Sequence, residues 1–167
     1  GEISASGAFS QGSVKVRPAR VNGRVNWEGS GLLGSFEIDL GDRGRINARV
    51  FSKQPAAFQV PRQGSFQAAW KALDIATLQP MLGDALHVKG RLSGEISGSL
   101  LPGSRFDLTG HTGISGGSFS WRGAQGEVTA PLKEAAVDWV WKDASLKGTA
   151  NLALAGYGRA EAAFQIP

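Results

Sequence analysis

The amino-acid sequence predicts an all-β protein, in which a long antiparallel meander of strands curls into an open hydrophobic trough. Apolar and polar residues alternate along nearly the whole chain, which is the period of strands with one wet face. Turn-forming residues interrupt the alternation every 8–14 residues or so, roughly the spacing that favours strands pairing with their sequence neighbours. Glycine is also about twice as frequent as its usual share of roughly 7%, with 24 residues among 167.

The clearest alternating run spans residues 86–100. One face of this run is formed by Leu86, Val88, Gly90, Leu92, Gly94, Ile96, Gly98 and Leu100. Every residue between them is polar or charged, so helical spacing is excluded. Glycine weakens a strand, and three glycines on the apolar face lead us to expect that the sheet bends strongly there. Turn signals elsewhere include Gly116-Gly117 and Gly156-Tyr157-Gly158.

One segment breaks the alternation and predicts a single short helix near residues 74–82. Asp74 or Thr77 can cap its start, and Gly83 suits the left-handed position after its end. Ile75, Leu78 and Leu82 share one side of this helix. We therefore expect it to plug an end or corner of the apolar core.

Composition and motifs argue against an enzyme. The chain has no cysteine, and His87 and His111 lack the spacing of metal ligands, so no metal site or cofactor is predicted. Neither a phosphate-binding loop nor a nucleophile elbow occurs. The net charge of +4 arises within residues 1–62, notably at Lys15, Arg17, Arg20 and Arg24. No aromatic residues interleave with these cations, so nucleic acid is not expected as a partner.

A family resemblance enters at residues 73–121. The segment reads "LDIATLQPMLGDA", then "LHVKGRLSGEISGSLLPGSRFDLTG", then "HTGISGGSFSW". It resembles the repeated unit of the TamB family, the inner-membrane component of the translocation and assembly module, within the AsmA-like proteins with repeating β-grooves. In that unit a Leu-x-x-Leu-x-Pro turn precedes a Gly-x-Leu-x-Gly strand, a Gly-x-Leu-x-x-Pro turn, and a strand ending in glycine and an aromatic residue.

The resemblance implies a trough, or β-taco, that conducts phospholipid across the periplasm of a Gram-negative bacterium. It also implies an anchor in the inner membrane and a TamA-like outer-membrane barrel as a partner. Because the chain starts at Gly1 rather than Met, we expect residues 1–167 to be one β-groove segment of a longer protein, with the anchor outside it. The family has no catalytic residues to carry over.

The candidate site is the apolar floor of the trough, where acyl chains would lie. Its residues are the large members of the apolar faces near the recognised unit: Leu92, Ile96, Phe106, Leu108, Trp139, Leu152 and Leu154. Two alternatives remain open at this point. The chain could be a scaffold or chaperone that captures client strands at a sheet edge, or a closed β-sandwich binding module. An unpaired edge would also allow copies of the segment to associate edge to edge.

Overall fold

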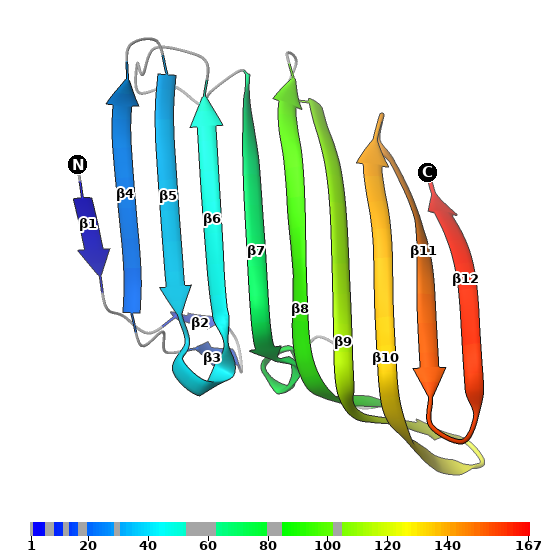
Figure 1. Ribbon diagram of the computed structural model, residues 1–167. Coiled ribbons are helices and arrows are strands. Elements are labelled where there is room, and N and C mark those ends of the chain that lie inside the picture. Colours follow the sequence, from blue (N-terminus) through cyan, green and yellow to red (C-terminus); the bar gives the residue numbers. More distant parts are fainter. Residues whose placement is uncertain are drawn as a thin grey trace.

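The computed structural model describes residues 2–5, 9–11, 14–16, 20–28, 31–52, 63–79, 85–101 and 105–167. Ten strands form one open antiparallel sheet in the order β1-β4-β5-β6-β7-β8-β9-β10-β11-β12 (Figure 1). Their bounds are β1 Glu2–Ala5, β4 Arg20–Glu28, β5 Gly31–Asp39, β6 Arg45–Ser52, β7 Gly64–Asp74, β8 Leu86–Leu101, β9 Arg105–Gly123, β10 Gly126–Lys142, β11 Ser145–Leu154 and β12 Gly158–Ile166. From β4 onward each strand pairs with the next strand of this sheet along the chain, as the alternation predicted.

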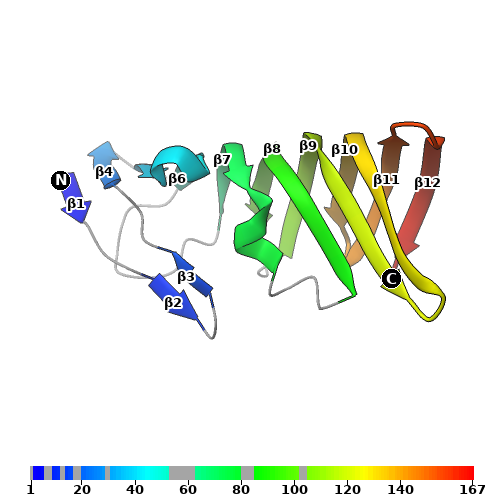
Figure 2. The ribbon, with the colours of Figure 1, turned by 90° about the horizontal axis from the view of Figure 1, so that it is seen from below.

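Three short elements complete the described structure. Strands β2 (Phe9–Gln11) and β3 (Val14–Val16) form a separate hairpin. The 3-10 helix η1 (Gly41–Arg43) connects β5 to β6, and the 3-10 helix η2 (Ile75–Leu78) follows β7. Figure 2 shows η2 and the β2–β3 hairpin on the same side of the sheet.

The sheet is a single layer for most of its breadth. Among the described residues, only Ile75, Ala130, Leu132 and Ala153 are buried apolar side chains. The chain exposes 11508 Å² to water. A compact monomer of the same mass exposes about 7,900 Å², so one sheet face lacks the second layer that a sandwich would supply. An all-β fold built on an open sheet is therefore confirmed, and the closed sandwich is not what the described part of the chain forms.

The predicted short helix is present as η2. The Asp74 side chain accepts a hydrogen bond from the Ala76 N–H at 3.0 Å, so Asp74 is the cap. Ile75 is 6% exposed, and η2 packs against β8. The remaining residues assigned to this helix, Pro80–Leu82, and Gly83 after it lie outside the described part of the chain.

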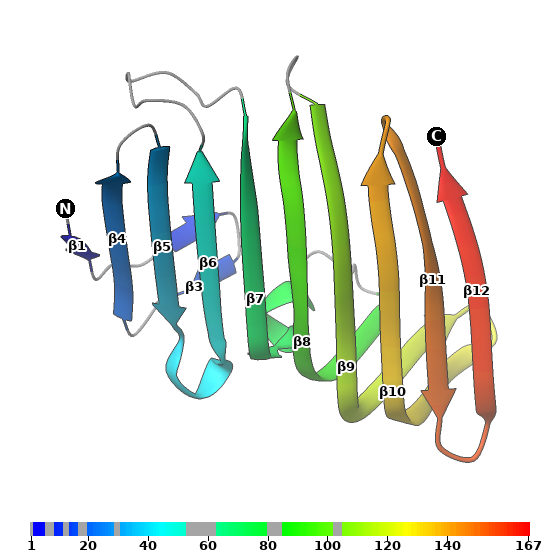
Figure 3. The ribbon, with the colours of Figure 1, turned by 45° about the horizontal axis from the view of Figure 1, so that its top comes forward.

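The long strands β8, β9 and β10 bend because three bulges lie at about the same level. β7 gains a residue around Ala72, which has φ 54°. β9 gains Gly116, with φ 67°, and β10 gains a residue between Leu132 and Glu134. Each bulge adds twist and bends its strand. Beyond the bulges the three strands turn across one side of the sheet, behind the view of Figure 3.

The predicted turn at Gly116-Gly117 is wrong. Both glycines lie inside β9, and their positive φ angles of 67° and 137° serve the bulge. The β9–β10 turn lies instead at Ala124 and Gln125, between the paired Gly123 and Gly126. A pair of glycines is compatible with either feature, because both need backbone conformations that favour glycine.

Candidate functional site

The apolar residues of neighbouring strands form continuous rows across the sheet. Cross-strand pairing puts directly opposite residues on the same face. The row through Ile96 consists of Gly23, Phe36, Ala48, Ala68, Ile96, Gly110, Trp139, Gly148 and Phe164. In its described part this row contains no polar side chain. We call the side of the sheet that carries it the apolar face.

The rows on either side of Ile96 have the same character. Towards the strand ends bearing Leu101 and Arg105, the row is Val25, Gly34, Val50, Phe66, Gly98, Leu108, Trp141, Leu146 and Ile166. On the other side, the row is Val21, Ile38, Ile46, Trp70, Gly94, Thr112, Val137, Ala150 and Ala162. Within their described residues these two rows carry no charge.

The glycines of the apolar face seat aromatic rings from the neighbouring strands. A Cβ added to Gly94 would lie 2.7 Å from the Trp70 ring, and one on Gly98 would lie 2.8 Å from the Phe66 ring. The Trp139 ring occupies the corresponding space above Gly110. These distances are shorter than real Cβ contacts, so a larger residue at any of these positions would force the ring to move. Glycine at these positions therefore leaves the space that an aromatic ring of a neighbouring strand occupies.

All seven predicted floor residues lie on the apolar face, but they do not form one compact cluster. Ile96 and Trp139 belong to the same row, with Gly110 between them. Leu92 and Leu152 share another row through Ile114 and Ala135. The remaining members are Leu108 in the Gly98 row, Phe106 opposite Leu100, and Leu154 opposite Leu132. Phe106 is 46% exposed, and the other six are half-buried.

One end of the apolar face is closed by the bent strands. Ala130 and Leu132, which belong to the apolar side of β10, are only 1% and 5% exposed. Since they lie at the bend and are buried, the strands turn towards the apolar face, on the side where Figure 2 places η2. Arg91 helps to hold this corner, because its guanidinium donates to the Ala72 carbonyl at 3.2 Å and also to the Asp42 carbonyl.

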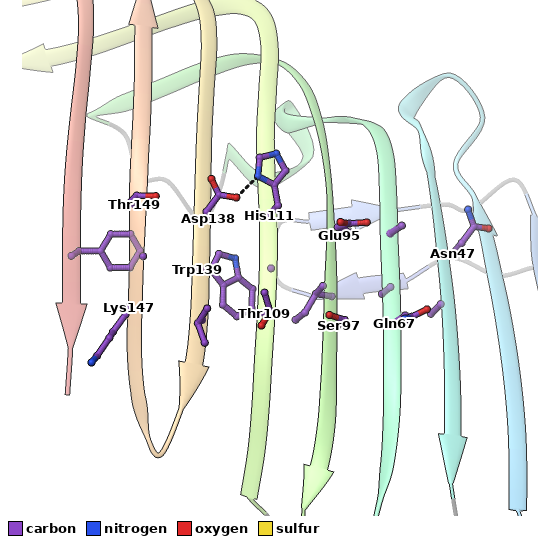
Figure 4. A pocket seen from close by; sticks show the side chains of 18 of the residues that line it. Asn47, Gln67, Glu95, Ser97, Thr109, His111, Asp138, Trp139, Lys147 and Thr149 are labelled. Carbon is purple, nitrogen blue, oxygen red and sulfur yellow. Dashed lines mark hydrogen bonds and ion pairs between the residues drawn. The ribbon is translucent and has the colours of Figure 1, made fainter.

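The opposite face is polar and holds a shallow groove of about 1360 Å³. Its lining comprises two adjacent polar rows together with the backbone of the Ile96 row between them. One polar row includes Glu95, His111 and Asp138, which Figure 4 shows on three neighbouring strands. His111 Nδ1 lies 2.6 Å from Asp138 Oδ1, and both side chains are exposed.

From the sequence, His111 was considered only as a possible metal ligand, and this row was not predicted. The signal was hidden because it depends on which residues of β8, β9 and β10 lie opposite one another. Within the described residues, no three His, Cys, Asp or Glu side chains form a group that could hold a metal ion. The described ion pairs of this face, such as Arg45 with Glu37 at 3.4 Å, are exposed and contribute about 0–1 kcal/mol each.

The cationic residues predicted near the start of the chain are only partly described. Arg20 and Arg24 lie on β4 and are exposed, in step with the polar residues of that strand. The side chain of Lys15, and Arg17 as a whole, lie outside the described set. No helix among the described residues has the length and hydrophobicity needed to cross a membrane.

Comparison with protein-family models, with curated proteins and with solved structures gave no match. The likeness to the TamB family therefore stands on the motif at residues 73–121.

Proposed function

We propose that the apolar face shelters the acyl chains of phospholipids, and that the chain is a segment of a periplasmic bridge that carries lipid between the inner and outer membranes. The observation that carries the proposal is a single-layer sheet whose apolar rows run unbroken from β4 to β12. An apolar face of this breadth needs a cover, and the buried side chains of this face among the described residues, Ala130 and Leu132, lie at the bent end.

The chemistry of the face favours hydrocarbon over a polar partner. Between β4 and β12 the hydrogen-bonding side chains of the three central rows are the indole N–H groups and Thr112. Each methylene removed from water contributes about 0.8 kcal/mol, so eight methylenes lying on the face would contribute about 6 kcal/mol. Aromatic rings seated on glycines leave few projections that would obstruct an extended chain.

Other parts of the proposal come from the motif at residues 73–121. These are the periplasmic location, an inner-membrane anchor outside this segment and a TamA-like barrel partner. The proposal assigns no catalytic step, no metal and no cofactor to the chain. The lipid is held by burial of its hydrocarbon, and the polar face remains in water.

A photo-crosslinking amino acid introduced at single positions tests this function. In cells, a probe in place of Ile96 should form a covalent adduct with phospholipid, detected by mass spectrometry of the purified protein. The same probe in place of Ser97, one residue along β8 and on the polar face, is the matched control and should give none. Equal labelling at both positions, or no lipid adduct at Ile96, would refute the proposal.

A second candidate function uses the free edge of β12. This strand pairs only with β11, so the backbone groups along its other edge have no partner strand in the described sheet. Only Arg159 and Glu161 carry charge along it, which gives little protection against added strands. Such an edge suits capture of a client strand or of a second copy.

Light scattering of the wild type and of Ala163→Lys distinguishes association through the β12 edge from lipid binding on the apolar face. A lysine on the edge strand should lower the concentration-dependent association of copies without affecting the lipid adduct at Ile96. A wild type that stays strictly monomeric at high protein concentration would count against pairing through β12.

A further inference from the structure

We propose that the end of the β9–β10 hairpin inserts into the surface of a lipid bilayer, with Trp121 and Val128 as its apolar anchors. The inference rests on the proposed function, because it identifies where the apolar face meets the membrane that supplies or receives the lipid. The hairpin end lies beyond the bulges and does not belong to the three central apolar rows of the sheet, so the proposed function has not yet assigned it a role.

The hairpin end carries a pair of large apolar side chains in the open. Trp121 pairs with Val128 across the hairpin and with Leu86 on β8. Trp121 is 50% exposed and Val128 is 49% exposed. The Trp121 ring lies against Gly123, at the last paired position before the turn, where a Cβ would stand 2.7 Å from ring atom Cζ3. The indole therefore sits at the extreme end of the hairpin.

The other side of the same hairpin end is polar. Arg122 and Glu127 form an exposed ion pair with 3.3 Å between Nη2 and Oε2. Next along the strands, the Ser120 and Thr129 hydroxyls lie 2.8 Å apart. Side chains with a hydrocarbon body and a polar tip, Trp above all, concentrate at the boundary between lipid headgroups and acyl chains. An element with one apolar and one hydrogen-bonding side fits that boundary.

The hairpin end is held in place rather than loosely attached. Its base contains the buried Ala130 and Leu132. Strand β8 pairs with β9 as far as Leu86 opposite Trp121, and the Arg122 N–H donates to the Ala85 carbonyl at 2.8 Å. The bulges direct the strands away from the plane of the sheet, so the turn at Ala124 and Gln125 projects from it (Figure 2). Trp121 is therefore exposed although the hairpin that carries it is anchored by packing, and its position relative to the sheet is fixed.

The apolar side of the hairpin end continues into the apolar face. After the Trp121–Val128 pair come Phe119 with Ala130, and then Leu132, which lies opposite Leu154 on β11. No charged side chain belongs to this described path. An acyl chain that leaves a bilayer beside Trp121 can therefore reach the sheet without crossing a charged row.

A bilayer fits this patch better than a protein does. A stable protein interface buries about 800 Å² on each partner, whereas the hairpin end, with the start of β8 beside it, presents two large exposed apolar side chains. A bilayer imposes no such minimum, because each side chain that enters it contributes separately.

The test is flotation of the protein with vesicles of phosphatidylcholine and phosphatidylglycerol. Trp121→Ser combined with Val128→Ser should lower the partition coefficient at least about tenfold, since each side chain loses much of its transfer free energy. The control combines Phe51→Ser with Val140→Ser, which are 42% and 44% exposed but lie on the polar face, and it should bind as the wild type does.

A second measurement does not depend on the stability of these variants. The chain has no cysteine, so Gln125→Cys accepts a single environment-sensitive fluorophore. We expect a blue shift on adding vesicles for the label at the hairpin end, and none for a label at Lys142→Cys, beside the turn between β10 and β11.

Vesicle binding that is unchanged by the Trp121 and Val128 substitutions, or no blue shift at position 125, would overturn the inference. Vesicle binding that requires phosphatidylglycerol and is abolished by salt would also overturn the inference, because it would reflect attraction of cationic side chains to anionic headgroups rather than insertion of Trp121 and Val128. Lipid delivered from cyclodextrin separates this inference from the proposed function. If the Trp121 and Val128 substitutions abolish vesicle binding while a probe at Ile96 still forms lipid adducts, both the inference and the proposed function are supported. If vesicle binding depends on Trp121 but a probe at Ile96 forms no lipid adduct, the proposed function alone is refuted.

Discussion

The glycines of the apolar face and the aromatic rings above them form matched pairs of residues. Gly110 faces the Trp139 ring, which takes the space where a Cβ would be. In the wild type, Gly110→Ala should cost about 1–3 kcal/mol through overpacking, although alanine is ordinarily better than glycine in a strand. In a Trp139→Val background the same change should cost little or become favourable. Urea unfolding of the four proteins measures this coupling, and strictly additive effects would contradict ring seating.

At the scale of single residues, the alternation predicted which side chains share a face but not which ones touch. The alternation put Leu92, Ile96 and Trp139 on one face of the sheet, and the strand pairing has them on one face, because side-chain direction follows from strand period alone. The pairing of His111 with Asp138 was not foreseen, because it depends on the register between β9 and β10. Register depends on turn position and on bulges, and the β9–β10 turn had been placed several residues too early.

At the scale of elements, bulges and one capped helical turn shape the closed end of the apolar face. The sequence offered Asp74 and Thr77 as possible caps, and Asp74 is the one that accepts a hydrogen bond from the Ala76 N–H. The sequence did not predict the bulge at Ala72, whose φ of 54° is unusual for alanine. Contacts from β8 hold that bulge: Ala72 N–H donates to Ser93 Oγ at 3.0 Å, and Arg91 donates to the Ala72 carbonyl. Such tertiary contacts override local preference.

The cap of η2 gives a direct test of this corner. Asp74→Ala removes the acceptor of the Ala76 N–H, and we expect the free energy of unfolding to fall by about 0.5–2 kcal/mol. Asp74→Asn retains a side-chain oxygen at the same place and should lose only a small part of that. Urea denaturation of the three proteins measures the difference. Equal stability of the wild type and the alanine variant would show that η2 does not depend on its cap.

At the scale of the whole molecule, the chain differs from an ordinary domain in how little it buries. It exposes 11508 Å², against about 7,900 Å² for a compact monomer of the same mass. The long alternating run at residues 86–100 and the glycines mixed with aliphatic residues on its apolar face pointed to this state, because they suggest a sheet with an uncovered apolar face. Bending was expected from the glycines at positions 90, 94 and 98, but its place was not, because the bend results from three bulges that align only once the strands have paired.

Because the apolar face is uncovered, a single charged substitution on it can abolish lipid binding without unfolding the protein. Ile96 is half-buried on the apolar face and Ser97 is exposed on the polar face, so Ile96→Asp and Ser97→Asp change the net charge equally on opposite sides of one strand. Because water already reaches Ile96, we expect Ile96→Asp to remain folded, with a loss of about 1–3 kcal/mol. A carboxylate facing hydrocarbon is strongly unfavourable, so lipid retained by the purified protein should fall at least about tenfold. Ser97→Asp should change neither quantity. Circular dichroism and native mass spectrometry of the same samples measure both. A folded Ile96→Asp protein that retains as much lipid as the wild type would show that acyl chains do not lie on this face.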